Sequence, residues 1–522
     1  MFCRELHLYS GKLIISATPF TQRNLNFIIF NIRNSAFYRV VIIFSAKVAE
    51  FVNYVSAIDL FCIICGCIIA KKDKIFSERM SVMKEMIKIA YIGHGGRGKY
   101  HIRNFIKMPD CEVVAVCDKY PDRADSMEAL IKEKTGKTPF KTTNYKDIIA
   151  KCDIDAVVVC TDWNMHLPIS IDFMEAGIPV GCEVGGADNM NEIWQLVETY
   201  RRTGSEFMML ENCCYGQKEM MVLNMVKKGL FGEVVHCDGG YRHQLYEEIL
   251  TGEENRHYRL NNYIHRNCDN YPTHALGPIA KILNINHGNR FVSLTSMASK
   301  AAGLNAYIKD HEVENKKLAD QKFNQGDVVV TNIKCANGET ITLNLCTTLP
   351  AFYSRSFNIY GTKAFHHEDT KSLVMDGDGI DLETEPWKNH WGNQEEYFKK
   401  YNHPIWKEYI EEGISSGHGG MDYLVCRAFV ESIKRGTKPP IDVYDAAAWM
   451  CITPLSEISI SMGSSPVAVP DFTYGKWIEP DLECRGKYSL NEIVEDPTVK
   501  IYPEGKKDKD GQNEKHETDL LA

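Results

Sequence analysis

The sequence lacks the features that mark nucleic-acid-binding, membrane and secreted proteins. It has no long stripe of lysine and arginine, and its formal net charge is −9, so it has no electrostatic footprint for nucleic acid or an anionic membrane surface. Its longest apolar run, Leu60 to Ala70, is shorter than the roughly 20 residues that a membrane helix needs. Met1 to Phe30 is polar and charged for most of its length, unlike a secretory signal. We therefore expect a cytoplasmic protein with a small, neutral substrate, and with neither nucleic acid nor a membrane as a partner.

The cysteines form neither a disulfide framework nor a metal site. The chain has 18 of them, scattered singly through apolar runs such as those around Cys117, Cys160 and Cys346, which is typical of reduced, buried thiols. The tightest cluster, CIICGC at 62–67, has no second ligand pair nearby. No set of histidine, cysteine and carboxylate residues in the later segments has metal-ligand spacing. We predict a reducing compartment and no metal.

The first 83 residues do not resemble the rest of the chain. Apolar stretches such as LNFIIFNI and LFCIICGCIIA alternate with scattered lysine and arginine, without glycine-marked strand-helix units. We expect residues 1–83 to be a poorly structured extension outside the functional protein. Met80, Met83 and Met86 stand just before the first regular strand and are candidate starts. The alternative interpretation is an internal anchor.

From Ile87 onward, short apolar strands alternate with helices. IKIAYIG, EVVAVCD, DAVVVCT, IPVGCEV and EFMMLEN are β-rich runs, and helices are expected at HGGRGKYHIRNFI and at about 166–177. This order predicts an α/β fold with an N-terminal Rossmann domain, that is, a doubly wound parallel sheet, over residues 84–212.

The first turn carries a dinucleotide-binding pattern. In Gly93-x-Gly95-x-x-Gly98, the first glycine allows the tight turn, the second lets backbone N–H groups approach a pyrophosphate, and the third packs helix on strand. Asp118 ends the next strand twenty residues after Gly98, where a carboxylate can bind ribose hydroxyls and repel a 2′-phosphate. A solvated residue at a strand end is the alternative, but the spacing favours NAD binding. Gly96 and Arg97 complete the predicted cofactor turn.

Other cofactor contacts are expected after the remaining strands, because ligands lie across the carboxyl ends of such sheets. The residues at these ends are Trp163, His166, Glu183, Val184 and Asn212. For Trp163 and His166 taken alone, packing at a helix start is an equally good interpretation.

Beyond Asn212 the pattern changes to that of an α+β domain, residues 213–480. Strands are expected at 291–299, 327–335 and 339–348, with Asn337-Gly338 marking a hairpin in an open, mainly antiparallel sheet. Helices are expected near 218–228, at 421–433 and at 444–462; the last two would cover the sheet or pack back on the Rossmann domain. Residues 481–522 form a tail, charged and expected to be largely disordered after 503.

These segments resemble two nested families. GHGGRG, a strand ending in Asp118, and CEV before an antiparallel sheet resemble the glucose-fructose oxidoreductase and inositol dehydrogenase superfamily. Within it, LENCCYGQKEMMVLNMVKKGLFGEVVHCDGGYRH, NYPTHALGP, LPAFYSRSF, YNHPIWKEY, SGHGGMDYLV and DVYDAAAWMCITPLSEISI resemble glycoside hydrolase family 109 from about Ile87 to Pro480. That family includes NAD-dependent α-N-acetylgalactosaminidases. The resemblance implies a hydrolase that uses NAD catalytically, in a superfamily whose members are commonly homo-oligomers through the open sheet face.

Three departures bear on the activity. Sugar dehydrogenases of the superfamily carry Glu-Lys-Pro where this chain has Glu183, Val184 and Gly185; family 109 also lacks that lysine, so Val184 favours a glycosidase. The family's Asp-Leu-Arg is replaced by Gln244, Leu245 and Tyr246, which leaves the substrate open. The family's Trp-x-Trp-His segment keeps Trp163 and His166 but loses its second tryptophan.

Motif matching implies which residues contact the sugar. Tyr271 and His274 are the candidate catalytic pair, and Pro272 suits a first helical turn that presents both side chains from one helix start. A satisfied histidine at a domain interface is the alternative, and Arg259 alone would be interpreted as a solvated surface residue. His418 closes the site or caps a helix. The implied sugar-binding residues are Tyr241, Arg259, Tyr271, His274 and Tyr353.

The resemblance implies a cycle without net redox change. Oxidation at sugar C3 acidifies the C2 hydrogen, elimination expels the group at C1, water adds, and the hydride returns to C3. Two alternatives stay open: an NAD-dependent sugar or polyol dehydrogenase, and a non-catalytic NAD-binding scaffold.

Overall fold

The computed structural model describes residues 84–313, 315–378, 386–413, 418–480 and 486–494. Before residue 84 it describes three strands, β1 (Glu5–Tyr9), β2 (Lys12–Ser16) and β3 (Phe30–Asn31), which form a separate antiparallel sheet. The expectations for the rest of residues 1–83, for CIICGC and for the tail after 503 fall outside the described residues.

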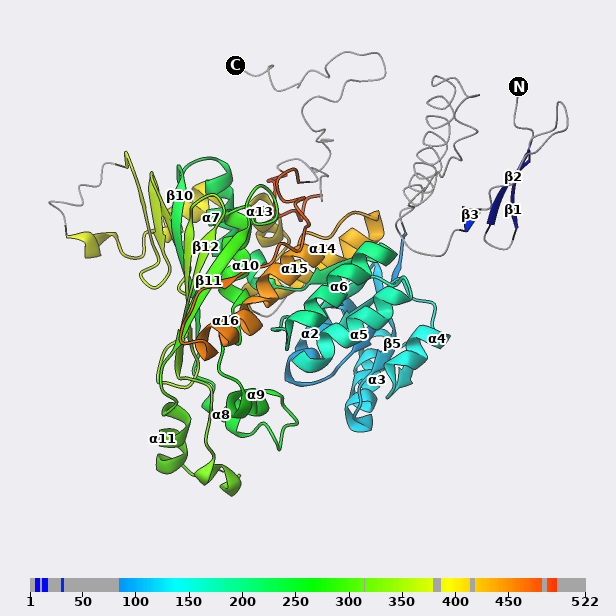
Figure 1. The fold of residues 1–522 in the computed structure, drawn as a ribbon, viewed down its shortest axis with the longest axis horizontal. Helices are drawn as coiled ribbons and strands as arrows, with labels where there is room; N and C mark the ends of the chain where they lie inside the picture. Colours follow the sequence, from blue (N-terminus) through cyan, green and yellow to red (C-terminus); the bar gives the residue numbers. More distant parts are fainter. Residues whose placement is uncertain are drawn as a thin grey trace, which may run out of the picture. The chain divides into compact units, whose positions relative to one another are not determined.

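The first domain is a parallel sheet of six strands with the order β6-β5-β4-β7-β8-β9 (Figure 1). Its central strands are apolar on both faces because helices cover both sides. The predicted doubly wound sheet is confirmed. The strands are β4 (Ile87–Ile92), β5 (Cys111–Cys117), β6 (Phe140–Thr142), β7 (Ala156–Val159), β8 (Val180–Cys182) and β9 (Phe207–Met209). The helices are α2 (Gly96–Ile106), α3 (Pro121–Thr135), α4 (Tyr145–Lys151), α5 (Trp163–Glu175) and α6 (Met190–Thr203).

The second domain is built on an eight-stranded sheet with the order β16-β15-β14-β10-β13-β12-β11-β17. The pair β10 and β13 is parallel, whereas the other pairs are antiparallel. The hairpin predicted at Asn337-Gly338 joins β12 to β13, and Gly338 has the positive φ of +110° that such a turn needs. The strands are β10 (Val234–Arg242), β11 (Phe291–Ala298), β12 (Val328–Cys335), β13 (Thr340–Cys346), β14 (Asn358–Gly361), β15 (Ala364–His367), β16 (Ser372–Met375) and β17 (Val467–Ala468).

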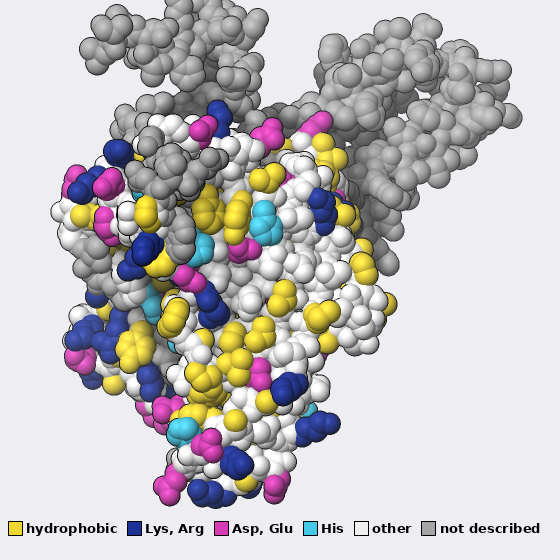
Figure 2. All heavy atoms as spheres, turned by 90° about the vertical axis from the view of Figure 1, so that its left-hand side faces the viewer, with side chains coloured by type: hydrophobic (Ala, Val, Ile, Leu, Met, Phe, Trp, Pro, Cys, Tyr) yellow, Lys and Arg dark blue, Asp and Glu magenta, His cyan; other side chains and the backbone are white. Residues whose placement is uncertain are grey.

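Helices cover one face of this sheet. The helix α10 packs on β10, and α16 packs on β11, where Ser459 accepts a hydrogen bond from the Ser296 backbone N–H. The opposite face, seen in Figure 2, carries apolar side chains among polar ones; Met297 is 65% exposed there. The helical elements are η1 (Asn212–Tyr215), α7 (Gln217–Lys227), α8 (Tyr246–Leu250), α9 (Arg259–His265), α10 (Thr273–Ile282), α11 (Gly303–Asp310), η2 (Lys316–Asp320), η3 (Trp387–His390), α12 (Gln394–Tyr401), α13 (Pro404–Glu412), η4 (His418–Gly420), α14 (Met421–Arg435), α15 (Val443–Met450) and α16 (Ile452–Ser461).

Two expected helices differ in the structure. The single helix expected at 444–462 is two helices, α15 and α16, that meet at Cys451. The break follows from Pro454, which has no N–H to donate and whose ring would clash with the preceding turn. The helix expected from 166 begins at Trp163 instead, where the indole Nε1 donates to the Val184 carbonyl at 3.2 Å.

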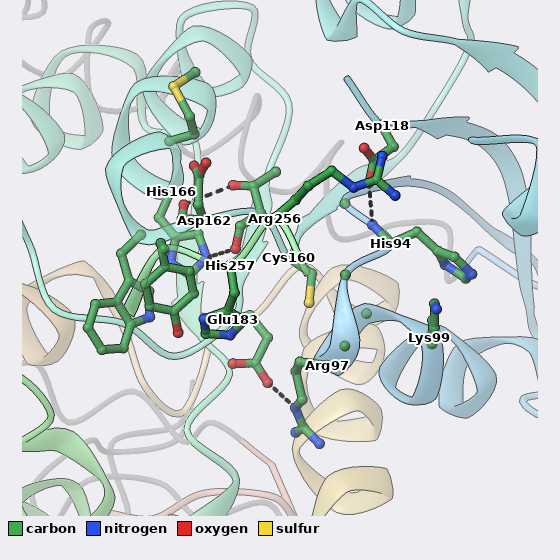
Figure 3. Close-up of a pocket in the computed structure, with 18 of the residues that line it drawn as sticks. His94, Arg97, Lys99, Asp118, Cys160, Asp162, His166, Glu183, Arg256 and His257 are labelled. Carbon is green, nitrogen blue, oxygen red and sulfur yellow. Dashed lines mark hydrogen bonds and ion pairs between the residues drawn. The ribbon is translucent and has the colours of Figure 1, made fainter. Parts of the chain in front are cut away.

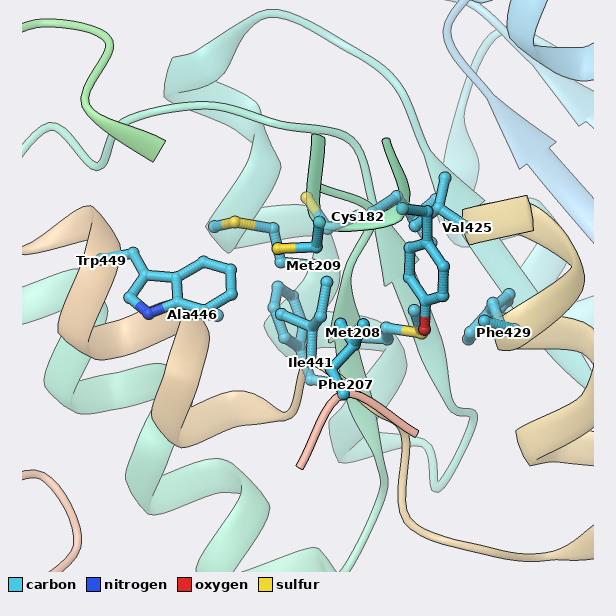
Figure 4. Close-up of a cluster of buried hydrophobic side chains, with 14 of the residues drawn as sticks. Cys182, Phe207, Met208, Met209, Val425, Phe429, Ile441, Ala446 and Trp449 are labelled. Carbon is cyan, nitrogen blue, oxygen red and sulfur yellow. The ribbon is translucent and has the colours of Figure 1, made fainter. Parts of the chain in front are cut away.

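The last helices return to the first domain. The helix α14 contacts β4 and α2, and α15 contacts β9. Figure 4 shows the resulting core, in which Phe207 and Met209 of β9 lie with Phe429 of α14 and Trp449 of α15. This packing fixes the two domains against each other. None of the helices in the described part of the chain has the length and apolar character that a bilayer crossing requires, and its cysteines are thiols without disulfides.

Candidate active site

A cavity of about 1340 Å³ lies at the carboxyl ends of β4 and β7, where the strand order of the parallel sheet reverses. Ligands of doubly wound sheets bind at such a switch point. The structure brings every predicted site residue to this one cavity, although the binding and catalytic roles stay predictions. These residues are Gly93, Gly95, Gly96, Arg97, Gly98, Asp118, Trp163, His166, Glu183, Val184, Asn212, Tyr241, Arg259, Tyr271, His274 and Tyr353.

The glycines of the first turn divide into two kinds. Gly93 has a φ of +99°, and a Cβ there would lie 2.2 Å from the Cys160 carbonyl oxygen; a Cβ on Gly98 would lie 2.4 Å from the Gly93 oxygen. A Cβ on Gly95 would meet no heavy atom nearer than 3.7 Å, and one on Gly96 would meet nothing within 4 Å. The first pair allows strand and helix to pack, while the second leaves the N-terminus of α2 open to the cavity. This is the cradle that a pyrophosphate requires, so the residues fit NAD.

Asp118 ties this turn together. Its buried carboxylate accepts hydrogen bonds from the backbone N–H of His94 at 2.7 Å and of Tyr120 at 2.9 Å. Figure 3 shows Asp118 at one end of the cavity and Glu183 with Arg97 at the other, while Arg256 reaches toward Asp118. The carboxylate is therefore placed for the predicted ribose contact and also supports the turn.

At the other end, Arg97 connects two other predicted cofactor residues, Glu183 directly and Asn212 through Asp422. Its Nε donates to Glu183 at 2.6 Å, and its two Nη atoms donate to Asp422 at 2.8 and 2.9 Å. Asn212 Nδ2 donates to Asp422 at 2.6 Å. Burial alone would raise the pKa of Asp422, but His418 and Arg97 hold it well below its usual range. Asp422 was not among the predicted site residues, and its contact with Arg97 spans 325 positions.

His418, to which the sequence assigned no chemical role, lies at the cavity rim. Its Nδ1 is 2.7 Å from Asp422 Oδ2, and its side chain is 59% exposed. It thus pairs with Asp422 in the first turn of α14 and makes no capping hydrogen bond to the backbone of that helix.

The position of the superfamily's lysine is apolar. Val184 is 4% exposed and packs with Trp163, Tyr241 and Tyr271. A Cβ on the following Gly185 would lie 2.5 Å from Trp163 Cδ1, so the turn after β8 fits closely around the indole. Val184 offers no group for proton transfer at this position.

A relay of three side chains crosses the domain boundary. Tyr271 directly precedes Pro272 and α10, and its hydroxyl lies 3.2 Å from His274 Nε2. The other ring nitrogen, Nδ1, lies 2.7 Å from Glu211 Oε1. Tyr271 and His274 thus come from one helix start, as the spacing predicted, with Pro272 as the N-cap. Sequence reasoning missed Glu211, although it stands at the carboxyl end of β9 beside Asn212.

Aromatic rings and one cation form the wall next to this relay. Tyr271 stacks on Trp163 with centroids 5.5 Å apart, and the Tyr241 ring lies 4.6 Å from that of Tyr271. The Arg259 guanidinium lies 5.1 Å from the Trp163 and Tyr271 centroids and is 6% exposed. The interpretation of Arg259 as a solvated surface residue is therefore wrong.

Tyr353 forms the outer part of the same wall. It is 50% exposed and packs edge-on against Tyr241 and His243. His243 Nδ1 lies 2.7 Å from the Tyr241 hydroxyl. Sequence reasoning did not assign His243 a role, although it ends the GGYRH string.

The phenols of this wall are neutral groups. Burial, reinforced by Tyr241 and Glu183 and opposed by Arg259, raises the pKa of Tyr271 well above its ordinary value. Burial likewise raises the pKa of Tyr241. Both hydroxyls keep their hydrogens at neutral pH, so they can donate hydrogen bonds, and the group suited to accept a proton is the imidazole of His274.

Glu211, Cys213 and His274 each bring one potential ligand atom within 4.8 Å of the others. Glu211 and His274 already pair with each other, and Arg355 Nη1 lies 3.0 Å from the Cys213 sulfur. We assign no metal to this group, and the expectation that the protein needs none stays a prediction.

Comparison with known proteins identifies both domains. Residues 215–479 match the model of the glycosyl hydrolase 109 C-terminal domain, and residues 87–210 match that of the oxidoreductase family NAD-binding Rossmann fold. A glycosyl hydrolase family 109 protein of Parabacteroides distasonis is 37% identical over 75% of this chain and 88% of its own length. An α-N-acetylgalactosaminidase of Tannerella forsythia is 36% identical over 75% of this chain and 87% of its own length. A solved levoglucosan dehydrogenase, in complex with NADH and levoglucosan, shares the fold, with 16% identity, a TM-score of 0.56 and coverage of 74% of this chain and 99% of its own.

Proposed function

This chain belongs to glycoside hydrolase family 109, and from that premise we propose that it hydrolyses α-N-acetylgalactosaminides with the help of tightly bound NAD. The relative from Tannerella forsythia carries the name of that activity. The first-turn glycines, Asp118, and the Arg97–Glu183 pair supply the two ends of a dinucleotide site.

NAD, when bound, supplies a hydride acceptor for sugar C3 that can return the hydride at the end of the turnover. The chain's own residues then handle the proton at C2, which a C3 ketone acidifies. His274 Nε2 accepts that proton, and the electron pair of the C–H bond becomes the C1–C2 double bond as the C1–oxygen bond breaks. The leaving group takes a proton from solvent, and water later adds across the double bond.

The aromatic wall orients the sugar for this chemistry. Tyr241 and Tyr271 keep their hydrogens. When the sugar binds, Tyr271 turns its hydrogen from His274 Nε2 to a ring hydroxyl, which frees that nitrogen to accept the C2 proton, and Arg259 offers a fixed positive charge beside both rings. The observation that carries the proposal is the Tyr271–His274 contact at 3.2 Å, placed at the mouth of a dinucleotide cradle.

The second candidate is an NAD-dependent sugar or polyol dehydrogenase, which the likeness to levoglucosan dehydrogenase supports at the level of fold. Val184 argues against it, because a buried valine stands where such enzymes carry a lysine. The third candidate, a non-catalytic NAD-binding scaffold, does not explain why Glu211, His274 and Tyr271 are hydrogen-bonded in series beside the cavity.

The test uses the purified protein without added cofactor. We expect it to release nitrophenol from 4-nitrophenyl α-N-acetylgalactosaminide without accumulating NADH, which is measured after chromatographic separation because nitrophenol absorbs in the same band. Accumulation of NADH with free N-acetylgalactosamine would instead identify a dehydrogenase. A protein that contains NAD but shows neither reaction on a panel of aryl glycosides and free sugars would be a scaffold.

We also propose that the protein is a homo-oligomer through the uncovered face of the eight-stranded sheet. Val330 and Met297 point outward there, next to Asn344 and Asn332, a mixture of apolar and small polar groups. Light scattering coupled to size-exclusion chromatography tests this, with a monomer as the contrary result.

A further inference from the structure

Glu211 is the buried partner of the histidine in the proposed site. It follows β9 in the first domain, whereas His274 lies on α10 in the second. The Glu211 side chain is 0% exposed. Its Oε1 lies 2.7 Å from His274 Nδ1 and accepts a hydrogen bond from the Cys213 backbone N–H at 3.0 Å.

We infer that Glu211 is a positioning residue that fixes the His274 ring with hydrogen on Nδ1 and the Nε2 lone pair directed at the Tyr271 hydroxyl. An ionised carboxylate has lone pairs but no hydrogen, so the nitrogen that faces it must carry one. In a neutral imidazole the other nitrogen is then the acceptor. The inference deepens the proposed function, on which it rests for its catalytic meaning.

The ionised state of Glu211 follows from its surroundings. Burial would raise its pKa, but His274 and the Cys213 backbone N–H lower it, and the net effect is a pKa below the ordinary value. The carboxylate therefore also stabilises the positive ring that forms when His274 takes a proton. Nearby, Arg259 and the neutral phenols offer no such counter-charge to the ring.

The experiment compares two variants of the holoprotein. Glu211→Gln keeps an oxygen that can accept from Nδ1 but removes the charge, whereas Glu211→Met removes both and keeps a chain of similar length. The ¹⁵N signals of labelled histidine rings, with His274 assigned through His274→Asn, report which nitrogen carries the hydrogen. Steady-state hydrolysis of 4-nitrophenyl α-N-acetylgalactosaminide gives kcat and KM.

The matched control is Glu219→Gln. Glu219 is also a buried carboxylate, 3% exposed, but it pairs with Arg355 rather than His274. Its loss should lower thermal stability without changing the His274 ring signals. This control separates a specific effect on the ring from the general cost of losing a buried charge.

We expect Glu211→Gln to keep the Nδ1–H form and lower kcat about tenfold, with KM nearly unchanged, because the charge behind the ring is lost. Glu211→Met should populate the Nε2–H form and lower kcat about 10²-fold or more. Unchanged ring signals in Glu211→Met, or a kcat equal to that of the parent in Glu211→Gln, would overturn the assignment. If Glu211→Met fails to fold, the kcat of Glu211→Gln alone tests the assignment. If the ring signals respond as expected but the parent hydrolyses no galactosaminide, the positioning role stands and the proposed function falls.

Discussion

The guanidinium of Arg256 binds both carboxylate oxygens of Asp122, at 2.8 and 3.1 Å. Arg256 lies between α8 and α9 of the second domain, and Asp122 lies in the first turn of α3 in the Rossmann domain. The same guanidinium covers the Tyr120 ring at 4.3 Å, and Arg123 donates to the Asn255 carbonyl at 2.8 Å. The second domain thus closes over the end of the cavity that holds Asp118.

This closure predicts that Arg256→Ala loses NAD faster than the parent. A cofactor that must return its hydride has to stay bound, and the variant opens the end where the adenosine would lie. We expect the NAD content after extended dialysis, measured in the supernatant of denatured protein, to fall several-fold. Arg435→Ala is the matched control, because Arg435 is also exposed and paired with a carboxylate, Glu431, away from the cavity. Equal NAD retention in both variants would refute this role.

The two kinds of glycine predict different defects. Gly93→Ala should destabilise the fold by about 2 kcal/mol or more, because Gly93 has a positive φ and a Cβ would overlap the Cys160 carbonyl. Gly95→Ala should lose NAD but melt at the temperature of the NAD-free parent, since its new methyl group meets no atom nearer than 3.7 Å and lies beside the N-terminus of α2, where the pyrophosphate would bind. Thermal unfolding and cofactor content measure both effects. A Gly95→Ala protein with full NAD content would contradict the cradle.

Substitutions of Tyr271 and His274 should lower kcat strongly without weakening the binding of NAD. Tyr271→Phe and His274→Asn each remove one group of the 3.2 Å contact, and we expect kcat to fall by about 10²- to 10⁴-fold, the range of general acid-base catalysis. NAD content and melting temperature should stay close to those of the parent. Variants that hydrolyse the aryl substrate at the parent's rate would exclude the pair from catalysis.

Buried histidines predict a loss of stability in mild acid. Burial lowers the pKa of His101 and of His366 to about 4, from the 6.5 expected in the unfolded chain. Between these two pH values the unfolded chain binds more protons than the folded one. The contribution of the two uncharged histidines to the free energy of unfolding is therefore complete above pH 6.5 and is lost as the pH falls toward 4. Each residue contributes up to about 3 kcal/mol to this decrease.

Denaturant unfolding at several pH values between 7 and 4.5 checks this dependence. His366→Gln should flatten it, since His366 is buried between the Phe357 carbonyl and Gln394. An equally steep dependence in the variant would show that other groups cause the acid sensitivity.

The fold could be predicted because its signals are local. Alternating strands and helices, the glycines after Ile92, and the Asn337-Gly338 turn each depend on a few neighbouring residues. The predicted sugar residues came from motif matching, and the structure brings them to one cavity.

Contacts between distant segments could not be predicted. Glu211 meets His274 across 63 positions, and Asp422 meets Arg97 across 325; neither pairing has a signal in spacing. The burial of Arg259 has no signal in its own segment for the same reason, because it depends on the rings of Trp163 and Tyr271. The break between α15 and α16 at Cys451, by contrast, has a local signal, because Pro454 stands three residues later in the sequence.

The most direct test of the central claim follows one hydrogen. The protein is incubated with 4-nitrophenyl α-N-acetylgalactosaminide in deuterated water, and the released sugar is analysed by NMR and mass spectrometry. Elimination and readdition predict one solvent deuterium at C2, with the original hydrogen kept at C3 by the returned hydride. Released sugar with its original hydrogen at C2 would contradict the account, whatever the rate of hydrolysis.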